Sequence, residues 1–238
     1  MISVVCCCNN IDQYESMLHS LHNQDVEYEM VCIDNRLSDY KSAACALNKG
    51  GGISKGKILV FVHQDIIFKE EDSLRRLVEA VKLHPLSVIG IHGASRGVRK
   101  NISGLKEAQT LDECCVAMER STWEKYKFNE ILCDGWHLYV VELCLRLGRE
   151  GAFIGSADFG ILHLSTGNVD GAYMKTFKLL MKQYKDVKYI ATTCKSMPNL
   201  MCFFYTYYVI WRMKKLFFGN LHIVYSIKKL IRRLDYQG

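Results

Sequence analysis

The sequence lacks several features that would assign it to a membrane-embedded, secreted or zinc-binding class. No apolar run reaches the roughly 18 residues that a membrane-spanning helix needs. No signal peptide is expected, because the first apolar run is short, has no basic lead and meets Asn9 and Asn10. No CxxC pair occurs among the 11 cysteines, so a zinc knuckle is not expected. These absences favour reduced thiols and a cytosolic setting.

The composition is that of a folded chain of moderate size. Its 238 residues, 49% hydrophobic and 24% charged, are enough for one α/β domain with an appendage. A formal net charge of +6 is too mild to predict a nucleic-acid partner. The sequence has neither internal repeats nor low-complexity segments. We therefore look for function in local motifs.

The most informative stretch is 57–68, which reads KILVFVHQDIIF. Its apolar residues 58–62 are typical of a central strand buried on both faces. His63, Gln64 and Asp65 then interrupt the apolar run, and a buried carboxylate is costly without a partner. Because open α/β sheets bind ligands at the carboxyl ends of their strands, we interpret Asp65 as a metal or substrate group there. An ordinary strand exit with a solvated Asp65 is the alternative.

The first half of the chain alternates strand and helix signals. Strands are predicted at 2–8, 29–34, 58–62 and 86–91. Helices are predicted between them: one capped by Asp12, one over 42–47 capped by Ser38 or Asp39 and closed by Gly50–Gly52, and one from Asp72 to Pro85. This β-α-β-α-β-α-β order predicts a parallel sheet with helices on both faces. Two of its strands lead to an aspartate, Asp34 or Asp65, at the same edge of the sheet.

The second half departs from this alternation. Residues 93–109 are predicted to form a long irregular excursion over the sheet edge. After it we expect a return strand at 111–118, short strands at 152–154 and 159–164, and helices over 121–126, about 138–147 and 168–184.

The tail from Met197 onward is aromatic and then basic. Residues 227–234 place apolar side chains on one helical face and basic ones on the other, which predicts an interfacial helix on anionic lipid. The alternative is a helical unit packed on the core or on a second subunit of an oligomer. Gly219 and Asn220 are the predicted hinge. The predicted division is a domain over 1–190 and a tail over 191–238.

Several motifs in this order resemble the family 2 glycosyltransferases of the GT-A fold. They are SVVCCCNN, CIDN, SAACALNKGGGISKGKILVFVHQD, LDECCVAMERSTWEKYKFNE, WHLYVVELCLRLGREG and HLSTG, and they run from about Ile2 to Tyr184. The resemblance implies a Rossmann-like, mostly parallel α/β sheet. It also implies a nucleotide-diphosphate sugar donor, UDP-linked in this chain.

Within this resemblance, His-Gln-Asp replaces the family's Asp-x-Asp motif, so Asp65 is the implied ligand for Mn²⁺ or Mg²⁺. His63 or His163 would complete the metal shell, and imidazole suits Mn²⁺ better than Mg²⁺. A hydrogen-bonded core histidine is the alternative for His163. The resemblance assigns donor binding to Cys7, Cys8, Asn9, Asp34, Asn48, Lys55 and Gln64, with Asp34 at the uracil. Arg96 is expected to close on the phosphates, with a solvated loop as its alternative.

The general base is where the sequence departs most from the family. The family often has Glu-Asp-x-Asp on its catalytic helix, and here Tyr139 and Val140 occupy the first pair. We predict Glu142 as the base, with Asp134 and His137 as alternatives. The competing interpretation pairs Glu142 with Arg146 one helical turn away.

Taken together, the resemblance implies an inverting, metal-dependent hexosyltransferase. It would move a sugar from a UDP-sugar to a surface-polysaccharide or lipid-linked acceptor at the cytoplasmic face of the cell membrane. Val140 motivates an alternative, a non-catalytic nucleotide-sugar-binding or scaffold subunit of a polysaccharide assembly system. A nucleotidyltransferase is disfavoured, because Cys8, Asn9 and Asn10 do not form the glycine-rich basic loop it would need.

Overall fold

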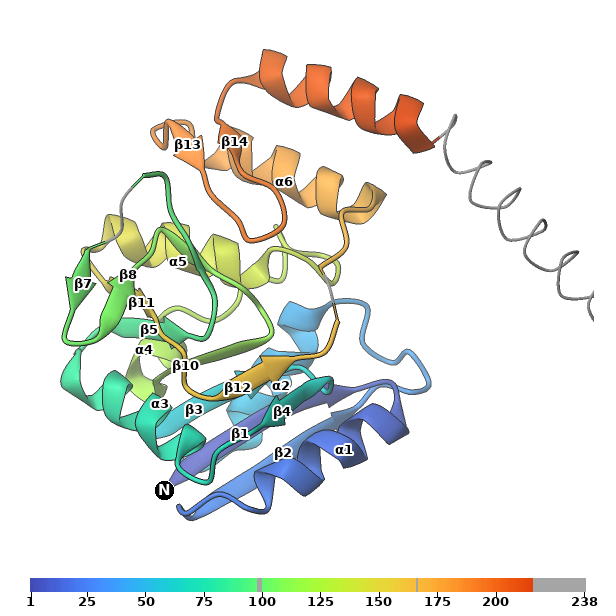
Figure 1. The fold of residues 1–238 in the computed structure, drawn as a ribbon. Coiled ribbons are helices and arrows are strands. Elements are labelled where there is room, and N and C mark those ends of the chain that lie inside the picture. The colour runs from blue at the N-terminus through green and yellow to red at the C-terminus, as the bar shows by residue number, and fades with distance from the viewer. Residues whose placement is uncertain (98–99, 166, 216–238) are drawn as a thin grey trace, which may run out of the picture.

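The computed structural model describes residues 1–97, 100–165 and 167–215 (Figure 1). Its centre is an eight-stranded sheet in the order β2-β1-β3-β10-β5-β11-β8-β7. The strands are β1 Ile2–Cys8, β2 Tyr28–Asp34, β3 Ile58–Val62, β5 Ser87–Gly90, β7 Asn101–Ile102, β8 Leu105–Glu107, β10 Cys115–Glu119 and β11 Phe153–Ser156. The predicted α/β class is confirmed.

The strand directions follow the predicted order. Strands β1, β2 and β3 are mutually parallel, and β10 enters antiparallel between β3 and β5. Strand β10 is the predicted return strand. Because it is antiparallel to both of its neighbours, β5 runs in the same direction as β3. In the β1–β2 ladder Cys8 pairs with Asp34, so both strands end at one edge of the sheet. That edge is where a parallel sheet presents a ligand site.

Helices cover both faces of the sheet (Figure 1). On one face lie α1 Ile11–Leu21 and α3 Ser73–Leu83, which bury Met17, Leu21, Leu74 and Leu77 against β1, β3 and β10. On the other face lie α2 Ala43–Ile53, α4 Arg120–Lys125 and α5 Tyr139–Arg149. Strand β3 is buried along its whole length, as its unbroken apolar run predicts.

Helix α2 shows one error of the sequence prediction. Gly50, Gly51 and Gly52 lie inside the helix instead of ending it. A Cβ on Gly50 would lie 2.4 Å from Val5 Cγ1, and one on Gly51 would lie 2.5 Å from the Trp123 ring. These glycines therefore allow the helix to approach β1 and α4 closely, which sequence periodicity does not reveal.

Four further predictions are corrected. The cap of α1 is Asn10, not Asp12, and the cap of α2 is Ser42, because their side chains accept the Gln13 and Cys45 N–H groups. Helix α4 begins at Arg120, after Glu119 at its N-cap position. The stretch 93–109 is not one irregular excursion: it forms β6 Gly93–Ala94, which pairs with β9 Thr110–Leu111, and β7 and β8 at the sheet edge.

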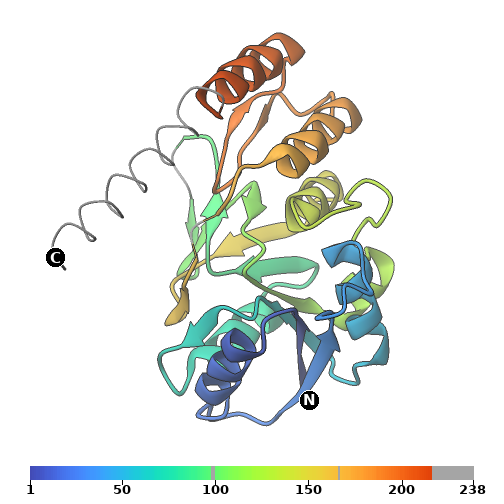
Figure 2. The ribbon, with the colours of Figure 1, turned by 90° about the vertical axis from the view of Figure 1, so that its right-hand side faces the viewer.

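A third layer lies beyond α5. Helix α6 Gly171–Gln183 packs Met174, Phe177 and Leu180 against the side of α5 that faces away from the sheet. A helix over 201–215 stacks on α6 through the buried Phe204 (Figure 2). Strands β13 Tyr189–Ile190 and β14 Met197–Pro198 pair across the predicted boundary at 190.

The far end of the predicted tail is not covered. Gly219, Asn220 and the amphipathic segment 227–234 lie outside the described residues. Within the residues that are described, no helix combines the length and the apolar character that crossing a bilayer requires.

Candidate donor and metal site

His63 and Asp65 stand at the carboxyl end of the central strand. Strand β3 ends at Val62, residues 63–65 turn, and a short strand β4 Ile66–Phe68 follows. The backbone N–H of His63 donates to the Cys114 carbonyl at 2.8 Å, which continues the ladder with the chain leading into β10. The turn is thus held by the sheet, and its polar side chains are directed to the edge that the fold predicts for a ligand.

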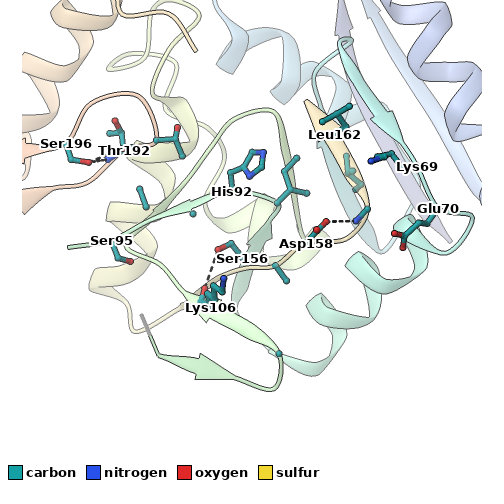
Figure 3. Close-up of a pocket in the computed structure, with 18 residues that line it drawn as sticks. Lys69, Glu70, His92, Ser95, Lys106, Ser156, Asp158, Leu162, Thr192 and Ser196 are labelled. Atoms are coloured by element: carbon teal, nitrogen blue, oxygen red, sulfur yellow. Dashed lines mark hydrogen bonds between the residues drawn. The ribbon is translucent and has the colours of Figure 1, made fainter. Parts of the chain in front are cut away.

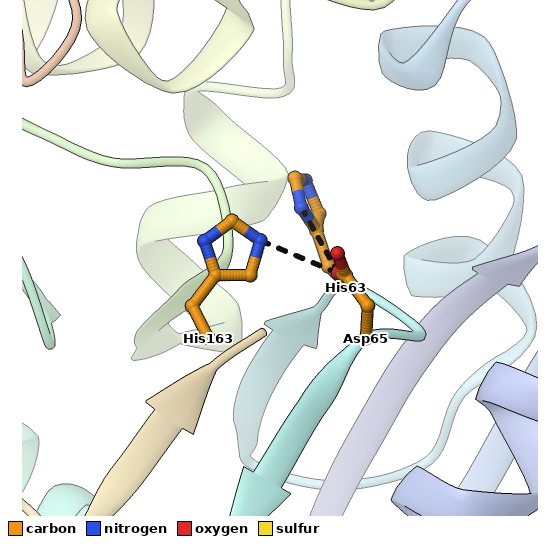
Figure 4. Close-up of side chains that lie close together, drawn as sticks. All are labelled: His63, Asp65 and His163. Atoms are coloured by element: carbon orange, nitrogen blue, oxygen red, sulfur yellow. Dashed lines mark ion pairs between the residues drawn. The ribbon is translucent and has the colours of Figure 1, made fainter. Parts of the chain in front are cut away.

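A two-stranded ladder brings His163 to the same place. Strand β12 Ile161–His163 runs antiparallel to β4, with His163 opposite Ile66. His163 Nε2 lies 3.3 Å from Asp65 Oδ1, and His63 Nδ1 lies 3.9 Å from the same oxygen (Figure 4). Ser165 Oγ lies 3.1 Å from His163 Nε2. The two imidazole rings approach edge to face, with centroids 5.6 Å apart.

The three side chains shift one another's protonation. The hydrogen bond from His163, joined by one from Ser165, lowers the pKa of Asp65 well below its usual range. The same contact raises the pKa of His163. Burial, reinforced by the neighbouring His163, lowers the pKa of His63. Asp65 is therefore a carboxylate and His63 a neutral imidazole at neutral pH, the forms in which these groups bind metals.

The cluster fits a divalent cation. One ligand atom from each of His63, Asp65 and His163 lies within 4.8 Å of the others. A carboxylate oxygen with two imidazole nitrogens suits Mn²⁺ better than Mg²⁺, which prefers an all-oxygen shell. The structure thus brings together the three ligands predicted from the sequence, and their binding of metal stays a prediction.

A cavity of about 260 Å³ opens beside this cluster. Its walls come from β1, α2, the 63–65 turn and the start of α5, and its lining residues are Cys7, Asn9, Ala43, Leu47, Val62, His63, Gln64, Asp65, Trp136 and Tyr139. A second cavity, of about 630 Å³, shares Asn9 and Trp136 with it and extends past Asn35, Arg36 and Tyr40. The two form a trough along the carboxyl ends of β1 and β2.

The predicted donor-binding residues divide into two groups. Cys7, Asn9 and Gln64 line the smaller cavity. The Gln64 side chain accepts from the backbone N–H groups of Asn9 and Asn10, at 2.8 and 3.0 Å, and so connects the loop after β1 to the turn at 63–65. Cys8 is buried, and the exposed Asp34 forms an ion pair with Arg36 at the rim of the larger cavity.

Three predicted donor residues make structural contacts instead. Asn48 bridges α2 to the Phe128 backbone, donating to its carbonyl and accepting from its N–H. The Lys55 backbone N–H donates to Glu29 at the opposite end of the sheet from the cluster. Arg96 lies over the Tyr189 ring, 5.1 Å from its centroid. None of the three lines the cavities beside the cluster.

The predicted bases are also engaged by other groups. The Glu142 side chain is 1% exposed and binds Arg146 at 2.9 Å and the Tyr184 hydroxyl at 2.8 Å. Asp134 pairs with Lys175 at 2.6 Å, and His137 lies 3.4 Å from Asp170. The geometry of Glu142 is that of a buried structural ion pair, the competing interpretation from the sequence. A base role for these three stays a prediction that these contacts do not favour.

Sequence reasoning missed two aromatic residues of the site. The Tyr139 hydroxyl lies 3.2 Å from His63 Nε2, so it orients the imidazole on the side away from Asp65. Trp136 stands where the two cavities meet. Tyr139 stands at a position where the family that the sequence resembles often has a carboxylate. This replacement by an aromatic residue is the sequence feature that could have marked Tyr139 as a site residue.

Comparison with known proteins identifies the fold and a family match for part of the chain. Residues 3–102 match a family described as "Glycosyltransferase like family". No curated protein matches the chain. The fold is that of GT-A glycosyltransferases, because several solved members superpose on most of the chain.

Three of these structures illustrate the likeness. S. aureus TarS 1–349 is 15% identical, with a TM-score of 0.52 over 76% of this chain. The mannosyltransferase PcManGT from Pyrobaculum calidifontis, solved with GDP-Man and Mn²⁺, is 13% identical, with a TM-score of 0.57 over 78% of this chain. GalNAc-T7, solved with UDP, GalNAc and Mn²⁺, is 13% identical, with a TM-score of 0.59 over 78% of this chain. TarS has also been solved with UDP and with UDP-GlcNAc. The chain spans 64%, 63% and 49% of these three proteins, respectively.

Proposed function

We propose that this chain, which has the GT-A fold and whose residues 3–102 match a glycosyltransferase-like family, is a metal-assisted, inverting hexosyltransferase that uses a UDP-sugar. One observation carries the proposal: His63, Asp65 and His163 converge at the end of β3, beside a trough that runs along β1 and β2. A trough at this edge is where an α/β sheet binds a nucleotide. The complexes of TarS with UDP and UDP-GlcNAc support the choice of nucleotide.

The roles of the residues follow from their positions. Asp65, His63 and His163 would hold Mn²⁺, which when bound neutralises the leaving diphosphate. Tyr139 and Ser165 keep the two imidazoles in place through their hydroxyl groups. Trp136 offers an aromatic face at the junction of the two cavities, on which a flat uracil ring can stack.

The first experiment measures UDP binding by calorimetry with Mn²⁺ and with EDTA. We expect Mn²⁺-dependent binding by the wild type and its loss in Asp65→Asn. Glu119→Gln, at the far end of β10, is a control that should bind like the wild type. Binding by Asp65→Asn at wild-type affinity would remove Asp65 from the metal site.

The second experiment measures turnover of UDP-glucose, UDP-galactose and UDP-GlcNAc by release of UDP. A specific observation favours a second candidate function, a non-catalytic nucleotide-sugar-binding or scaffold subunit: Val140 lacks the family carboxylate, and Glu142 is sequestered by Arg146. That alternative predicts UDP binding with no turnover of any of the three donors. Turnover that depends on Asp65 would reject it.

The proposal extends to the acceptor and to the membrane. We propose a surface-polysaccharide or lipid-linked acceptor, reached at the cytoplasmic face of the cell membrane. The helix over 201–215 supports membrane contact, because it exposes large apolar side chains next to basic ones; the apolar residues include Phe203, Val209, Ile210 and Met213.

Flotation with vesicles containing phosphatidylglycerol tests the membrane contact. Replacing Phe203, Ile210 and Met213 by Ser should release the chain from these vesicles, because it removes exposed apolar area and leaves the packing of Phe204 on α6 intact. Neutral phosphatidylcholine vesicles are the control and should bind weakly. Undiminished binding by the triple variant would reject this surface as the contact.

A further inference from the structure

A large polar cavity adjoins the metal cluster along β12. Its volume is about 1100 Å³, roughly four times that of the cavity beside Asp65. Ile161 and Leu162 line it, and Figure 3 labels Leu162 on this wall. His163 of the cluster is the next residue of the same strand. Its other walls carry hydroxyl and cationic groups, among them Lys69, Ser95, Lys106, Ser156, Thr193 and Ser196. Such a lining suits a hydroxyl-rich acceptor.

Asp112 lies between this cavity and the cluster. A carboxylate oxygen of Asp112 lies within 4.8 Å of a ring nitrogen of His163. The Thr193 hydroxyl, which belongs to a residue of the cavity wall, donates to Asp112 Oδ2. The carboxylate is therefore in contact with the wall of the large cavity on one side and close to His163 of the cluster on the other.

The surroundings of Asp112 hold its carboxylate in place without neutralising it. Oδ1 accepts the Cys114 backbone N–H at 3.0 Å. The loop that carries Thr193 is anchored by Thr110, whose hydroxyl donates to the Ala191 carbonyl at 2.6 Å. Among the described residues, no lysine, arginine or histidine forms an ion pair with Asp112.

Asp112 is better suited to accept a proton than to bind a second metal ion. The third member of its group, Cys114, is a fully buried thiol, and an apolar environment disfavours the thiolate that binds metals. The two acids that line the cavity are held by other groups and are not near the cluster: Glu70 pairs with Arg76, and Asp158 accepts the Gly160 N–H in its own turn.

We propose that Asp112 is the general base of the transfer reaction, a role that rests on the proposed glycosyltransferase function. The proton of the acceptor hydroxyl moves to a carboxylate oxygen of Asp112 while the acceptor oxygen forms a bond to the anomeric carbon. The bond from that carbon to the diphosphate oxygen breaks, and its electron pair leaves with UDP. Asp112 thus supplies, from the chain before β10, the carboxylate that Val140 does not supply on α5.

The test uses azide, a nucleophile that needs no deprotonation. Wild type and Asp112→Asn are incubated with Mn²⁺ and the three UDP-sugars, with and without sodium azide, and UDP and glycosyl azide are quantified. Asp112→Asn should bind UDP with Mn²⁺ like the wild type. It should hydrolyse donor at least ~100-fold more slowly, and azide should restore UDP release with formation of glycosyl azide. Glu119→Gln is the control and should resemble the wild type throughout.

Each other outcome has a definite meaning. Hydrolysis by Asp112→Asn at the wild-type rate overturns the proposal, and so does a slow variant that binds UDP but yields no glycosyl azide. A wild type that neither binds UDP nor turns over a donor rejects the glycosyltransferase function itself. If Asp112→Asn does not fold, Thr193→Val serves instead: loss of its hydrogen bond should slow hydrolysis about 5- to 10-fold and leave the azide reaction unchanged. Unchanged hydrolysis would then overturn the proposal.

Discussion

His163 Nε2 contacts Asp65 Oδ1 at 3.3 Å because β12 and β4 form an antiparallel ladder with His163 opposite Ile66. A shift of one residue in this register would turn His163 to the other face of the ladder. Backbone pairing therefore sets the geometry of the cluster. Substitutions of its side chains should change metal binding more than folding.

The first prediction concerns metal binding by the cluster. We expect Mn²⁺ to raise the thermal unfolding temperature of the wild type, because a ligand that binds the folded chain stabilises it. His163→Ala should abolish this increase and leave the metal-free unfolding temperature within a few degrees of the wild type. An equal Mn²⁺ effect in both proteins would place the metal elsewhere. His19→Ala, on an exposed helix position, is a matched control.

The second prediction concerns pH and Glu113. Burial, together with the neighbouring Asp112, raises the pKa of Glu113 from 4.5 to about 8. The folded chain therefore binds this proton more tightly than the unfolded chain, so the contribution of Glu113 to stability should be largest at low pH and fall as the pH rises between these two values. Each pH unit in that window removes up to about 1.4 kcal/mol from the free energy of unfolding.

Glu113→Gln should flatten this dependence. The test is urea denaturation of both proteins at pH 5, 6, 7 and 8. The variant should gain stability relative to the wild type as the pH rises. Parallel curves would show that Glu113 does not titrate differently in the folded and unfolded chains.

The third prediction compares two neighbouring glycines of α2. Gly51→Ala should destabilise the chain by about 1–3 kcal/mol, because its Cβ would lie 2.5 Å from the Trp123 ring. Gly52→Ala has no atom within 4 Å of its Cβ and should stabilise the helix by up to about 1 kcal/mol. Both are measured by urea denaturation. Equal effects at the two positions would contradict the close approach of α2 to α4.

The fourth prediction concerns the buried pair on α5. Arg146→Met should cost about 3–5 kcal/mol, because it leaves the carboxylate of Glu142 buried without its charge partner. The double variant Glu142→Met, Arg146→Met should recover most of that loss, since no lone charge then remains. Equal stability of the single and double variants would contradict this account.

Turnover by Glu142→Gln tests the base role predicted from the sequence. If Glu142 is only a structural partner of Arg146, turnover per folded molecule should stay near the wild-type value. A loss of ~100-fold or more, with the fold intact, would instead support Glu142 as the base.

Much of the architecture follows from local patterns. The unbroken apolar run 58–62 predicts β3 as the central buried strand, and the polar turn after it marks the site edge. The prediction failed where tertiary contacts override local signals. Gly50 and Gly51 indicate a helix end by composition, yet they serve close packing against Val5 and Trp123.

The candidate site, like the fold, could be predicted from the sequence only in part. His63, Asp65 and His163 were named from the sequence and meet in the structure. Asn48 and Lys55 were assigned to the donor through the resemblance of the stretch before β3 to the family, but such a likeness does not give the direction of a side chain. Asp112 was not singled out, because its position beside His163 depends on the pairing of β12 with β4 and on the loop that carries Thr193.

If the cluster binds Mn²⁺ as proposed, the ladder between β4 and β12 also links that binding to the order in which the chain is synthesised. His63 and Asp65 are synthesised long before His163, so until β12 has docked only two of the three proposed ligands are in place. An ion bound by both Asp65 and His163 would hold β12, which is synthesised late, against β4, which is synthesised early. Manganese supply during synthesis should therefore influence how much of the chain matures, apart from any effect on turnover.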